Sequence, residues 1–316
     1  MKKVTRVVAL AVLAVVSLAW LSVLSIHGPQ AIRTSWEVAK LKLSGRAAYL
    51  SWGQVLWYVV PDGLRSSSMR PLRFGWACMR APVRVLKAGS GSCSTQWETP
   101  LGHFWGNADE GEHLAFLSDE ELTGAVYNRP PVAVRQGDVV IDGGAHIGTF
   151  SRFAFNHGAR KVIAFEPDPS NAECLKRNFE EELGDARMVL VQKALWDRSG
   201  VLNLMHGTHS GATKVSEATG LGEGLVPATT IDDALAELKL DRVDFIKLDI
   251  EGAERHAMAG AARTLGRFGP RMVLCTYHLP GDAVKITETV LRLRPSYWVF
   301  ATFEQAYFYE EGGGGR

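Results

Sequence analysis

The sequence predicts an α/β fold built on a mostly parallel, seven-stranded sheet that ends in an antiparallel hairpin. An apolar run at 138–142 leads into a glycine-rich turn, as a strand of an open α/β sheet often does. After it, apolar runs alternate with segments of helical period, which indicates parallel strands joined by crossover helices. The last two apolar runs are too close together for a crossover and therefore predict an antiparallel pair.

The expected elements follow one another in a regular order from residue 138. The predicted strands are 138–142, 161–166, 188–193, 243–249, 271–277, 296–302 and 305–310. The predicted helices are 147–157, 170–182, 230–239, 253–267 and 282–293. Pro169, Ser170 and Asp282 are residue types that favour helix starts.

Three further segments are predicted outside this alternation. A short strand is expected at 83–87, and a helical fragment at 118–127 with Ser118 and Glu121 as its capping box. The segment 206–227 is rich in Gly, Thr, Ser and Ala, and we expect it to be a loop that can close over a site.

The turn after the first strand has the composition of a nucleotide-binding site. Asp142 ends the strand, and the turn continues with Gly143, Gly144, Ala145, His146, Ile147 and Gly148. Glycines let the backbone approach a ligand that lies beyond the carboxyl end of the strand. Glu166 ends the next strand, where an acid can accept hydrogen bonds from two ribose hydroxyls. The two features together predict a bound adenosine compound.

Two cofactors fit this description. The spacing of Gly143, Ala145 and Gly148 also satisfies a loose dinucleotide fingerprint, so a nicotinamide cofactor is an alternative. Asp142 opposes it, because a pyrophosphate beside that carboxylate would meet a like charge at a helix N-terminus that favours an anion. S-adenosylmethionine carries a sulfonium and an ammonium group and no phosphate, so we predict it as the cofactor.

Charge is distributed unevenly along the 316 residues. Residues 1–100 hold 13 Lys and Arg against 3 Asp and Glu, together with six of the nine Trp. Basic charge interleaved with Trp suits a membrane surface, and no nucleic-acid-binding module is recognisable. Val7–Ile26 contains no charged residue, is long enough to span a bilayer and exceeds the apolar part of a typical signal peptide. We therefore expect an uncleaved, single-pass N-terminal anchor.

The expected organisation places this anchor at 1–30, a basic Trp-rich juxtamembrane region at 31–100, a catalytic domain at 101–311 and a disordered tail at 312–316. Positive residues flank both sides of the anchor, so charge does not decide its orientation. A cytosolic catalytic domain is expected because S-adenosylmethionine is made and used in the cytosol. The four cysteines do not indicate a disulfide framework in a chain of this length.

Four segments of the chain resemble the FkbM family of S-adenosylmethionine-dependent methyltransferases. They are Gly137–Gly148, Phe165–Pro167, Thr230–Asp232 and Val243–Glu254. The run KLDIEGAE at the end of the last segment is the most diagnostic. The resemblance covers about half of the chain and does not extend to residues 1–100. It implies the class I methyltransferase (Rossmann-like) fold and methyl transfer, usually to an oxygen of a sugar or natural product.

The resemblance also implies roles for residues that follow the strands. Those implied to bind the donor are Asp142, Gly143, Gly144, Ala145, Gly148, Glu166, Pro167, Ala194 and Leu195. Among them, Glu166 falls on the ribose-binding acid, and Ala194 and Leu195 fall where the family contacts adenine. Many members also have an acid within the fifth strand, before its His. Here that strand ends Cys275-Thr276-Tyr277-His278, so His278 is kept but a carboxylate to orient it is missing from the strand.

Asp249, Glu251 and His278 are the predicted catalytic residues, because they follow the fourth and fifth strands. A hydroxyl acceptor must be aligned with the methyl group and must lose its proton. His278 titrates nearest to neutral pH and could take that proton, whereas Asp249 could be the base or hold the acceptor hydroxyl. The structural alternatives are a capped turn for Asp249, a helix-start ion pair for Glu251 and a hydrogen-bonded His278.

Lys247 lies within a buried strand pattern, and we expect it to pair with a carboxylate. No metal is predicted, because the acids do not form a convincing oxygen cage and no Cys/His spacing suggests zinc.

The expected function is that of a membrane-anchored oxygen methyltransferase. Its acceptor would be a glycan, a glycolipid or another small molecule, and no nucleic-acid partner is expected. One alternative is an NAD(P)-dependent oxidoreductase, against which Asp142 and the KLDIEGAE run argue. The other is a non-catalytic, membrane-anchored scaffold that keeps a donor-binding fold. Oligomeric state is not specified by the sequence.

Overall fold

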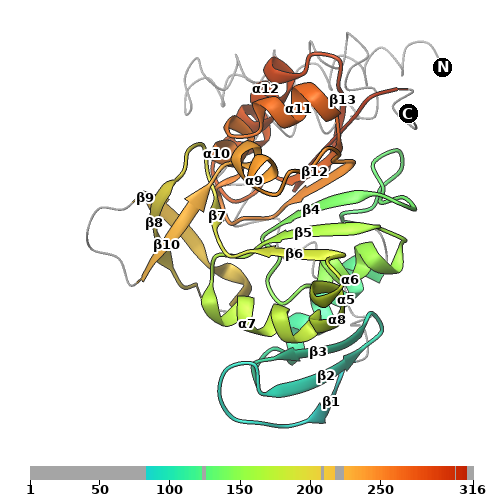
Figure 1. Ribbon diagram of the computed structural model, residues 1–316, viewed down its shortest axis with the longest axis vertical. Coiled ribbons are helices and arrows are strands. Elements are labelled where there is room, and N and C mark those ends of the chain that lie inside the picture. The colour runs from blue at the N-terminus through green and yellow to red at the C-terminus, as the bar shows by residue number, and fades with distance from the viewer. Residues whose placement is uncertain (1–82, 123–125, 208–209, 218–223, 303, 312–316) are drawn as a thin grey trace, which may run out of the picture. The chain divides into compact units, whose positions relative to one another are not determined.

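A seven-stranded sheet forms the centre of the described part of the chain. The computed structural model describes residues 83–122, 126–207, 210–217, 224–302 and 304–311 (Figure 1). The strands of this sheet are β4 (Val139–Gly143), β5 (Lys161–Phe165), β6 (Met188–Val191), β11 (Phe245–Leu248), β12 (Arg271–Cys275), β13 (Trp298–Ala301) and β14 (Gln305–Tyr309). Their order across the sheet is β13-β14-β12-β11-β4-β5-β6.

The strand directions confirm the predicted sheet. Strands β12, β11, β4, β5 and β6 are parallel to one another. Strand β14 is antiparallel to both β12 and β13, so the chain ends in the expected hairpin. Parallel strands bring their carboxyl ends to one edge of the sheet, and the residues that follow β4, β5 and β11 therefore meet there.

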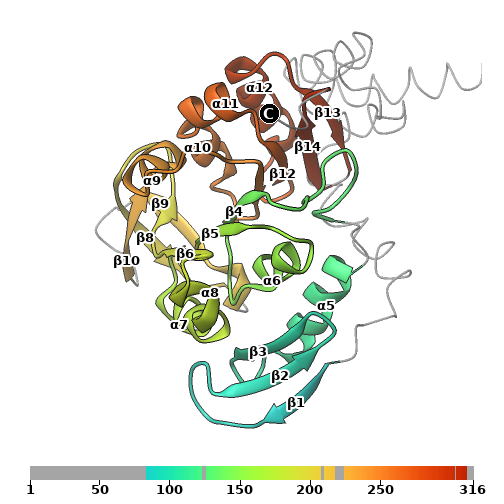
Figure 2. The same ribbon diagram turned by 45° about the vertical axis from the view of Figure 1, so that its right-hand side comes forward.

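Helices cover both faces of the sheet, as Figure 1 and Figure 2 show. On one side lie α5 (Gly111–Leu122), α6 (Thr149–Asn156), α7 (Pro169–Asn178) and α8 (Glu180–Gly184). On the other lie α9 (Ile231–Glu237), α10 (Glu254–Ala259), α11 (Ala262–Phe268) and α12 (Asp282–Leu293). Helix α7 is capped by Asp168, whose carboxylate accepts the N–H groups of Ser170 and Asn171, and Pro169 lies in its first turn.

Three helix predictions were wrong in detail. The segment 170–182 is divided at Phe179 into α7 and α8. The segment 253–267 is divided into α10 and α11, because the carboxylate of Asp232 accepts the N–H groups of Arg263 and Thr264 and caps a second helix. The capping box at Ser118 and Glu121 does not exist, because helical hydrogen bonding already begins when Leu114 N–H donates to the carbonyl of Glu110. Ser118 and Glu121 are instead buried in the interior of α5.

A three-stranded antiparallel sheet precedes the central one. It consists of β1 (Arg84–Lys87), β2 (Thr95–Thr99) and β3 (Gly102–Gly106), and it packs against α5 and α7 (Figure 2). Strand β1 confirms the strand expected at 83–87. Residue 101, where the catalytic domain was expected to begin, lies in the turn between β2 and β3.

A four-stranded sheet lies beside the carboxyl ends of β4, β5 and β6 (Figure 1). Its order is β7 (Ala194–Leu195), β10 (Gly224–Thr229), β8 (Gly200–Met205) and β9 (Lys214–Glu217). The prediction of a loop over 206–227 was therefore wrong for β9 and for the first part of β10. The physical reason is burial: Val215 of β9 and Val226 of β10 pack with Leu202 and Leu204 of β8 in one apolar cluster.

The predicted anchor Val7–Ile26 and the tail 312–316 lie outside the described residues, as does most of the region 31–100. Within the part of the chain that the structure describes, no helix is both long enough and apolar enough to cross a membrane.

Lys247 is a buried cation in the centre of the sheet. Its Nζ lies 3.1 Å from Oδ1 of Asp142 and donates to the carbonyl oxygens of Gly143 and Gly144 at 3.2 and 2.8 Å. Ser151 Oγ donates to the other oxygen of Asp142 at 2.7 Å. Burial lowers the pKa of Lys247, but the charges of Asp142 and Asp249 outweigh it and raise that pKa, so the ammonium stays charged. The predicted pairing of Lys247 with a carboxylate is confirmed.

We expect Lys247→Met to lower the free energy of unfolding by about 3–5 kcal/mol, because the buried Asp142 carboxylate would lose its cation. Urea denaturation followed by circular dichroism measures the change. The double variant Lys247→Met/Asp142→Asn removes both charges and should recover part of the loss. A single variant as stable as the wild type would contradict the importance of this pair.

Candidate functional site

A cleft opens where the central sheet and the four-stranded sheet meet. The segments that follow β4, β5 and β11 form one part of it, and β7, β9 and the 3-10 helix η1 (Ser210–Ala212) form another. The lining residues are Gly144, His146, Phe165, Glu166, Pro167, Asn171, Lys193, Ala194, Leu195, Ser210, Gly211, Thr213, Val215, Asp249, Ile250, Glu251 and Ala253. The cleft therefore combines apolar walls with a few carboxylates, as ligand sites commonly do.

The structure separates the predicted donor-binding residues into two groups. Gly144, Glu166, Pro167, Ala194 and Leu195 line the cleft. The remaining four do not line it; they are Asp142, Gly143, Ala145 and Gly148. In this second group, Asp142 and Gly148 contact other parts of the chain, as described below.

Asp142 meets a cation of the protein. Its side chain is fully buried, and its two carboxylate oxygens contact Lys247 and Ser151. The acid at the end of β4 therefore holds the turn in place. Asp142 does bind a cation, as the sequence predicted, but the cation is Lys247 of the protein and not the ligand.

Gly144 and Gly148 are required by packing. Both have positive φ angles, 72° and 99°. A Cβ at Gly144 would lie 1.9 Å from the carbonyl oxygen of Asp249, and one at Gly148 would lie 2.2 Å from the ring of Phe179. These glycines let the turn pass close to the end of β11 and to α7, in conformations that L-residues rarely adopt.

Glu166 is the acid best placed to bind a diol. Its Oε2 accepts the N–H of His146 at 2.8 Å, and its Oε1 accepts the N–H of Asp168 at 3.0 Å. Burial raises the pKa of Glu166 and outweighs the nearby His146 and the two N–H groups, which lower it. Each carboxylate oxygen keeps a second lone pair. The apolar side chains of Phe165 and Leu195 line the same cleft. The carboxylate of Glu166 therefore suits the ribose of an adenosine compound, and the apolar side chains suit its base.

The three predicted catalytic residues come together at the carboxyl ends of β11 and β12. His278 Nε2 lies 3.3 Å from Asp249 Oδ1 and 3.6 Å from Glu251 Oε1. His278 Nδ1 lies 3.0 Å from Oε1 of Glu254, at the start of α10. The carboxylate missing from the fifth strand is thus supplied by Glu254. The sequence did not reveal this pairing because the two residues belong to different elements.

The charge state of His278 differs from the sequence expectation. Burial lowers the pKa of His278, but Glu251, Glu254 and Asp249 outweigh it and raise the pKa to about 11. The imidazole is therefore protonated at neutral pH and cannot accept a proton there. Burial raises the pKa of Asp249, but the positive charges of His278 and Lys247 outweigh burial and lower that pKa overall. Asp249 is therefore ionised.

Two tyrosines complete the surroundings of Asp249, and sequence reasoning missed both. Tyr127 donates its hydroxyl to Oδ2 of Asp249 at 2.6 Å, and the hydroxyl of Tyr277 lies 3.5 Å from Oδ1. Burial strongly raises the pKa of Tyr127, so it stays a proton donor. Tyr277 adjoins His278, which gave a weak signal. Tyr127 lies outside every recognised motif.

Two groups of side chains in the described residues bring three possible metal ligands within 4.8 Å of one another. One consists of Asp249, Glu251 and His278. In this structure its histidine forms ion pairs with the two acids. The other consists of Glu110, His113 and His146. The predicted absence of a metal stays a prediction.

Comparison with known proteins gives concordant matches. A family model described as "Methyltransferase FkbM domain" matches residues 142–300. The 31-O-demethyl-FK506 methyltransferase FkbM of Streptomyces tacrolimicus is 32% identical over 186 residues, which cover 49% of this chain and 70% of that protein. The 2-O-methyltransferase NoeI of Sinorhizobium fredii (strain NBRC 101917 / NGR234) is 27% identical over 146 residues, or 40% of this chain and 58% of that protein.

Among solved structures, the methyltransferase FkbM from Methylobacillus flagellatus KT aligns with a TM-score of 0.47 and 21% identity. The alignment covers 64% of this chain and 55% of that one. This chain therefore spans less than two thirds of that structure and of the rhizobial relative.

The strand order, with its antiparallel last strand, and the cleft at the carboxyl edge define a class I methyltransferase-like α/β protein. The chain belongs to the FkbM methyltransferase family. It is thus a methyltransferase, and the family implies S-adenosylmethionine as its methyl donor. Of the alternatives that the sequence left open, a dinucleotide oxidoreductase and a non-catalytic scaffold receive no support from this membership.

Proposed function

We propose that this protein transfers the methyl group of S-adenosylmethionine to a hydroxyl oxygen of a glycan, a glycolipid or another small molecule. The observation that carries the proposal is that Glu166 and Asp249 line the same cleft. One carboxylate suits the ribose of an adenosine donor, and the other is ionised and available to an acceptor hydroxyl. The names of two relatives, a 31-O-demethyl-FK506 methyltransferase and a 2-O-methyltransferase, support an oxygen acceptor.

On the donor side, Glu166 would accept hydrogen bonds from the two ribose hydroxyls. The adenine would lie against the apolar surface of Ala194 and Leu195, and the backbone at Gly144 would leave room for the methionine part. The bound donor supplies a methyl group that is already activated by a sulfonium. The protein has to hold the acceptor oxygen in line with it and exclude competing water.

On the acceptor side, Asp249 would accept a hydrogen bond from the acceptor hydroxyl and take its proton as the oxygen–carbon bond forms. Tyr127 and His278 hold Asp249 in place, and their contacts keep it ionised before the acceptor arrives. His278 would thus act as a positioning residue. Its positive charge would offset the negative charges of Asp249, Glu251 and Glu254. Glu251 lines the cleft beside Asp249 and would contact a polar group of the acceptor.

We expect the full chain to bind S-adenosylmethionine in isothermal titration calorimetry, with an affinity that Glu166→Ala lowers about 10–100-fold. The loss of hydrogen bonds to a charged group accounts for a change of this size. Glu173→Ala, which changes an exposed acid on α7, is the matched control and should bind normally. Binding of NADH in place of S-adenosylmethionine by the folded protein would contradict the proposed donor.

Asp249→Asn should lower kcat by about 10²–10⁴-fold, the usual contribution of a general base. The affinity for S-adenosylmethionine should not change, because the donor contacts would remain. Transfer of a labelled methyl group to a panel of saccharides and glycolipids measures kcat, and calorimetry measures donor binding. The exposed Asp241→Asn serves as control. Full activity of Asp249→Asn would assign the proton to another acceptor group.

The expected anchor at Val7–Ile26 motivates a lipid-borne acceptor. We expect the full chain to methylate a saccharide headgroup faster on glycolipid vesicles than free in solution, because the anchor raises its effective concentration at the membrane. A variant without residues 1–30 should lose this preference. Equal rates of the full chain on both substrates would contradict the membrane-bound acceptor and leave methyl transfer itself untouched.

A further inference from the structure

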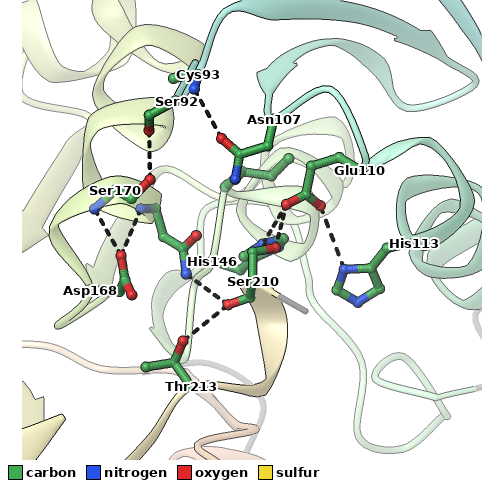
Figure 3. Close-up of polar contacts among 12 residues, drawn as sticks. Ser92, Cys93, Asn107, Glu110, His113, His146, Asp168, Ser170, Ser210 and Thr213 are labelled. Carbon is green, nitrogen blue, oxygen red and sulfur yellow. Dashed lines mark hydrogen bonds and ion pairs between the residues drawn. The ribbon is translucent and has the colours of Figure 1, made fainter. Parts of the chain in front are cut away.

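A second cluster of ionisable side chains lies at the rim of the cleft, away from the residues assigned to proton transfer. Glu110 precedes α5, His113 lies in the first turn of that helix, and His146 belongs to the glycine-rich turn after β4. Figure 3 shows the Glu110 carboxylate with one oxygen directed toward His113 and the other toward His146 and Ser210. Neither the fold nor the proposed methyl transfer requires two histidines and a buried acid at this point.

The spacing of these groups matches the coordination shell of a small cation. Glu110 Oε2 lies 3.6 Å from His113 Nδ1, and Glu110 Oε1 lies 3.7 Å from His146 Nε2. Zinc bonds to nitrogen and oxygen are about 2.0–2.2 Å long, so two ligands at a tetrahedral angle lie about 3.4 Å apart. One ligand atom from each of the three side chains lies within 4.8 Å of the other two, so the three can converge on one ion by side-chain movement.

The burial of the cluster gives an independent indication of a ligand. Glu110 is 3% exposed and His146 is 8% exposed. Among the described residues, Oε2 of Glu110 has no hydrogen-bond partner, and it lies 3.6 Å from His113 Nδ1. A buried polar atom left in this state is destabilising, and a cation bound by the Glu110 carboxylate would satisfy it.

We propose that Glu110, His113 and His146 form a binding site for a divalent transition-metal ion of the Zn²⁺ class. Two imidazoles and one carboxylate are a donor set that suits Zn²⁺ and similar ions, whereas Mg²⁺ and Ca²⁺ prefer oxygen ligands. His113 is the most exposed of the three, with 22% of its side chain accessible, and offers a path for the ion. A water molecule or the Ser210 hydroxyl would complete the coordination.

The hydrogen bonds of Ser210 would change when the ion binds. Its hydroxyl donates to Oε1 of Glu110 and lies 2.7 Å from Nε2 of His146. An ion held by the Glu110 carboxylate and by His146 would compete with these two hydrogen bonds, so Ser210 would either become a ligand or move away. Because Ser210 and His146 both line the cleft, and the N–H of His146 binds Glu166, the ion would hold the glycine-rich turn in place.

The test is a metal titration of the full chain, purified in detergent without a histidine tag and freed of metal with a chelator. We expect one Zn²⁺ per chain by calorimetry, with a raised Tm, and a Co²⁺ absorption spectrum typical of a low-symmetry site. Each of three ligand variants should weaken Zn²⁺ binding strongly: Glu110→Gln, His113→Gln and His146→Gln. The expected loss of affinity exceeds about 10–100-fold, which is the usual effect of removing a residue that only supports a ligand. His103→Gln, which changes an exposed histidine on β3, is the matched control and should bind normally.

Two outcomes would overturn the proposal. One is the absence of stoichiometric Zn²⁺ or Co²⁺ binding by the folded wild type, which would leave the cluster as a hydrogen-bonded link between α5 and the turn. The other is equal binding by the control and the three ligand variants. If a variant of the two buried ligands does not fold, the more exposed His113 decides the question. Folded His113→Gln should lose the Co²⁺ spectrum, and a spectrum equal to that of the wild type would overturn the proposal.

Discussion

The buried pair of Lys247 and Asp142 joins β11 to the glycine-rich turn after β4, the two segments that carry Asp249 and Gly144. Lys247 points from β11 into the start of the glycine-rich turn, where it contacts the carboxylate of Asp142 and the carbonyls of Gly143 and Gly144. Gly144 lines the donor side of the cleft, and Asp249 follows Lys247 by two residues. One ammonium group thus links the strand that leads to Asp249 with the turn that lines the donor side of the cleft. A buried charge is tolerated there only because Lys247 is surrounded by its hydrogen-bond and ion-pair partners.

The same principle recurs at the carboxyl edge of the sheet. Asp142 is paired with Lys247, and the cluster of Asp249, Glu251 and Glu254 surrounds a protonated His278. Glu166 differs, because its contacts are backbone N–H groups. Hydrogen bonds of this kind orient a carboxylate and leave lone pairs for a ligand. Among the acids that line the cleft, Asp249 and Glu251 are thus held by a charged side chain, whereas Glu166 is held by the backbone.

Sequence reasoning located the acids of the site but not their partners. Asp142, Glu166 and Asp249 were identified because each ends a strand in a recognisable motif. Tyr127, which donates to Asp249, lies 122 residues away along the chain. Glu254 reaches His278 from a different helix, so the histidine that looked like a base carries a proton instead. Such pairings depend on which elements become neighbours in the fold, and no local spacing records them.

The sequence by itself determined the order of the strands of the central sheet, the closing hairpin, and the positions of the glycine turn and the acids. These features follow from the periodicity of apolar residues and from turn chemistry, both of which act over a few residues. Only the tertiary structure decided that Asp142 binds Lys247, that Gly144 and Gly148 serve packing, and that Glu110 and His113 approach His146. Each of these results from contacts between distant segments, where burial and charge, rather than local conformation, determine what a side chain does.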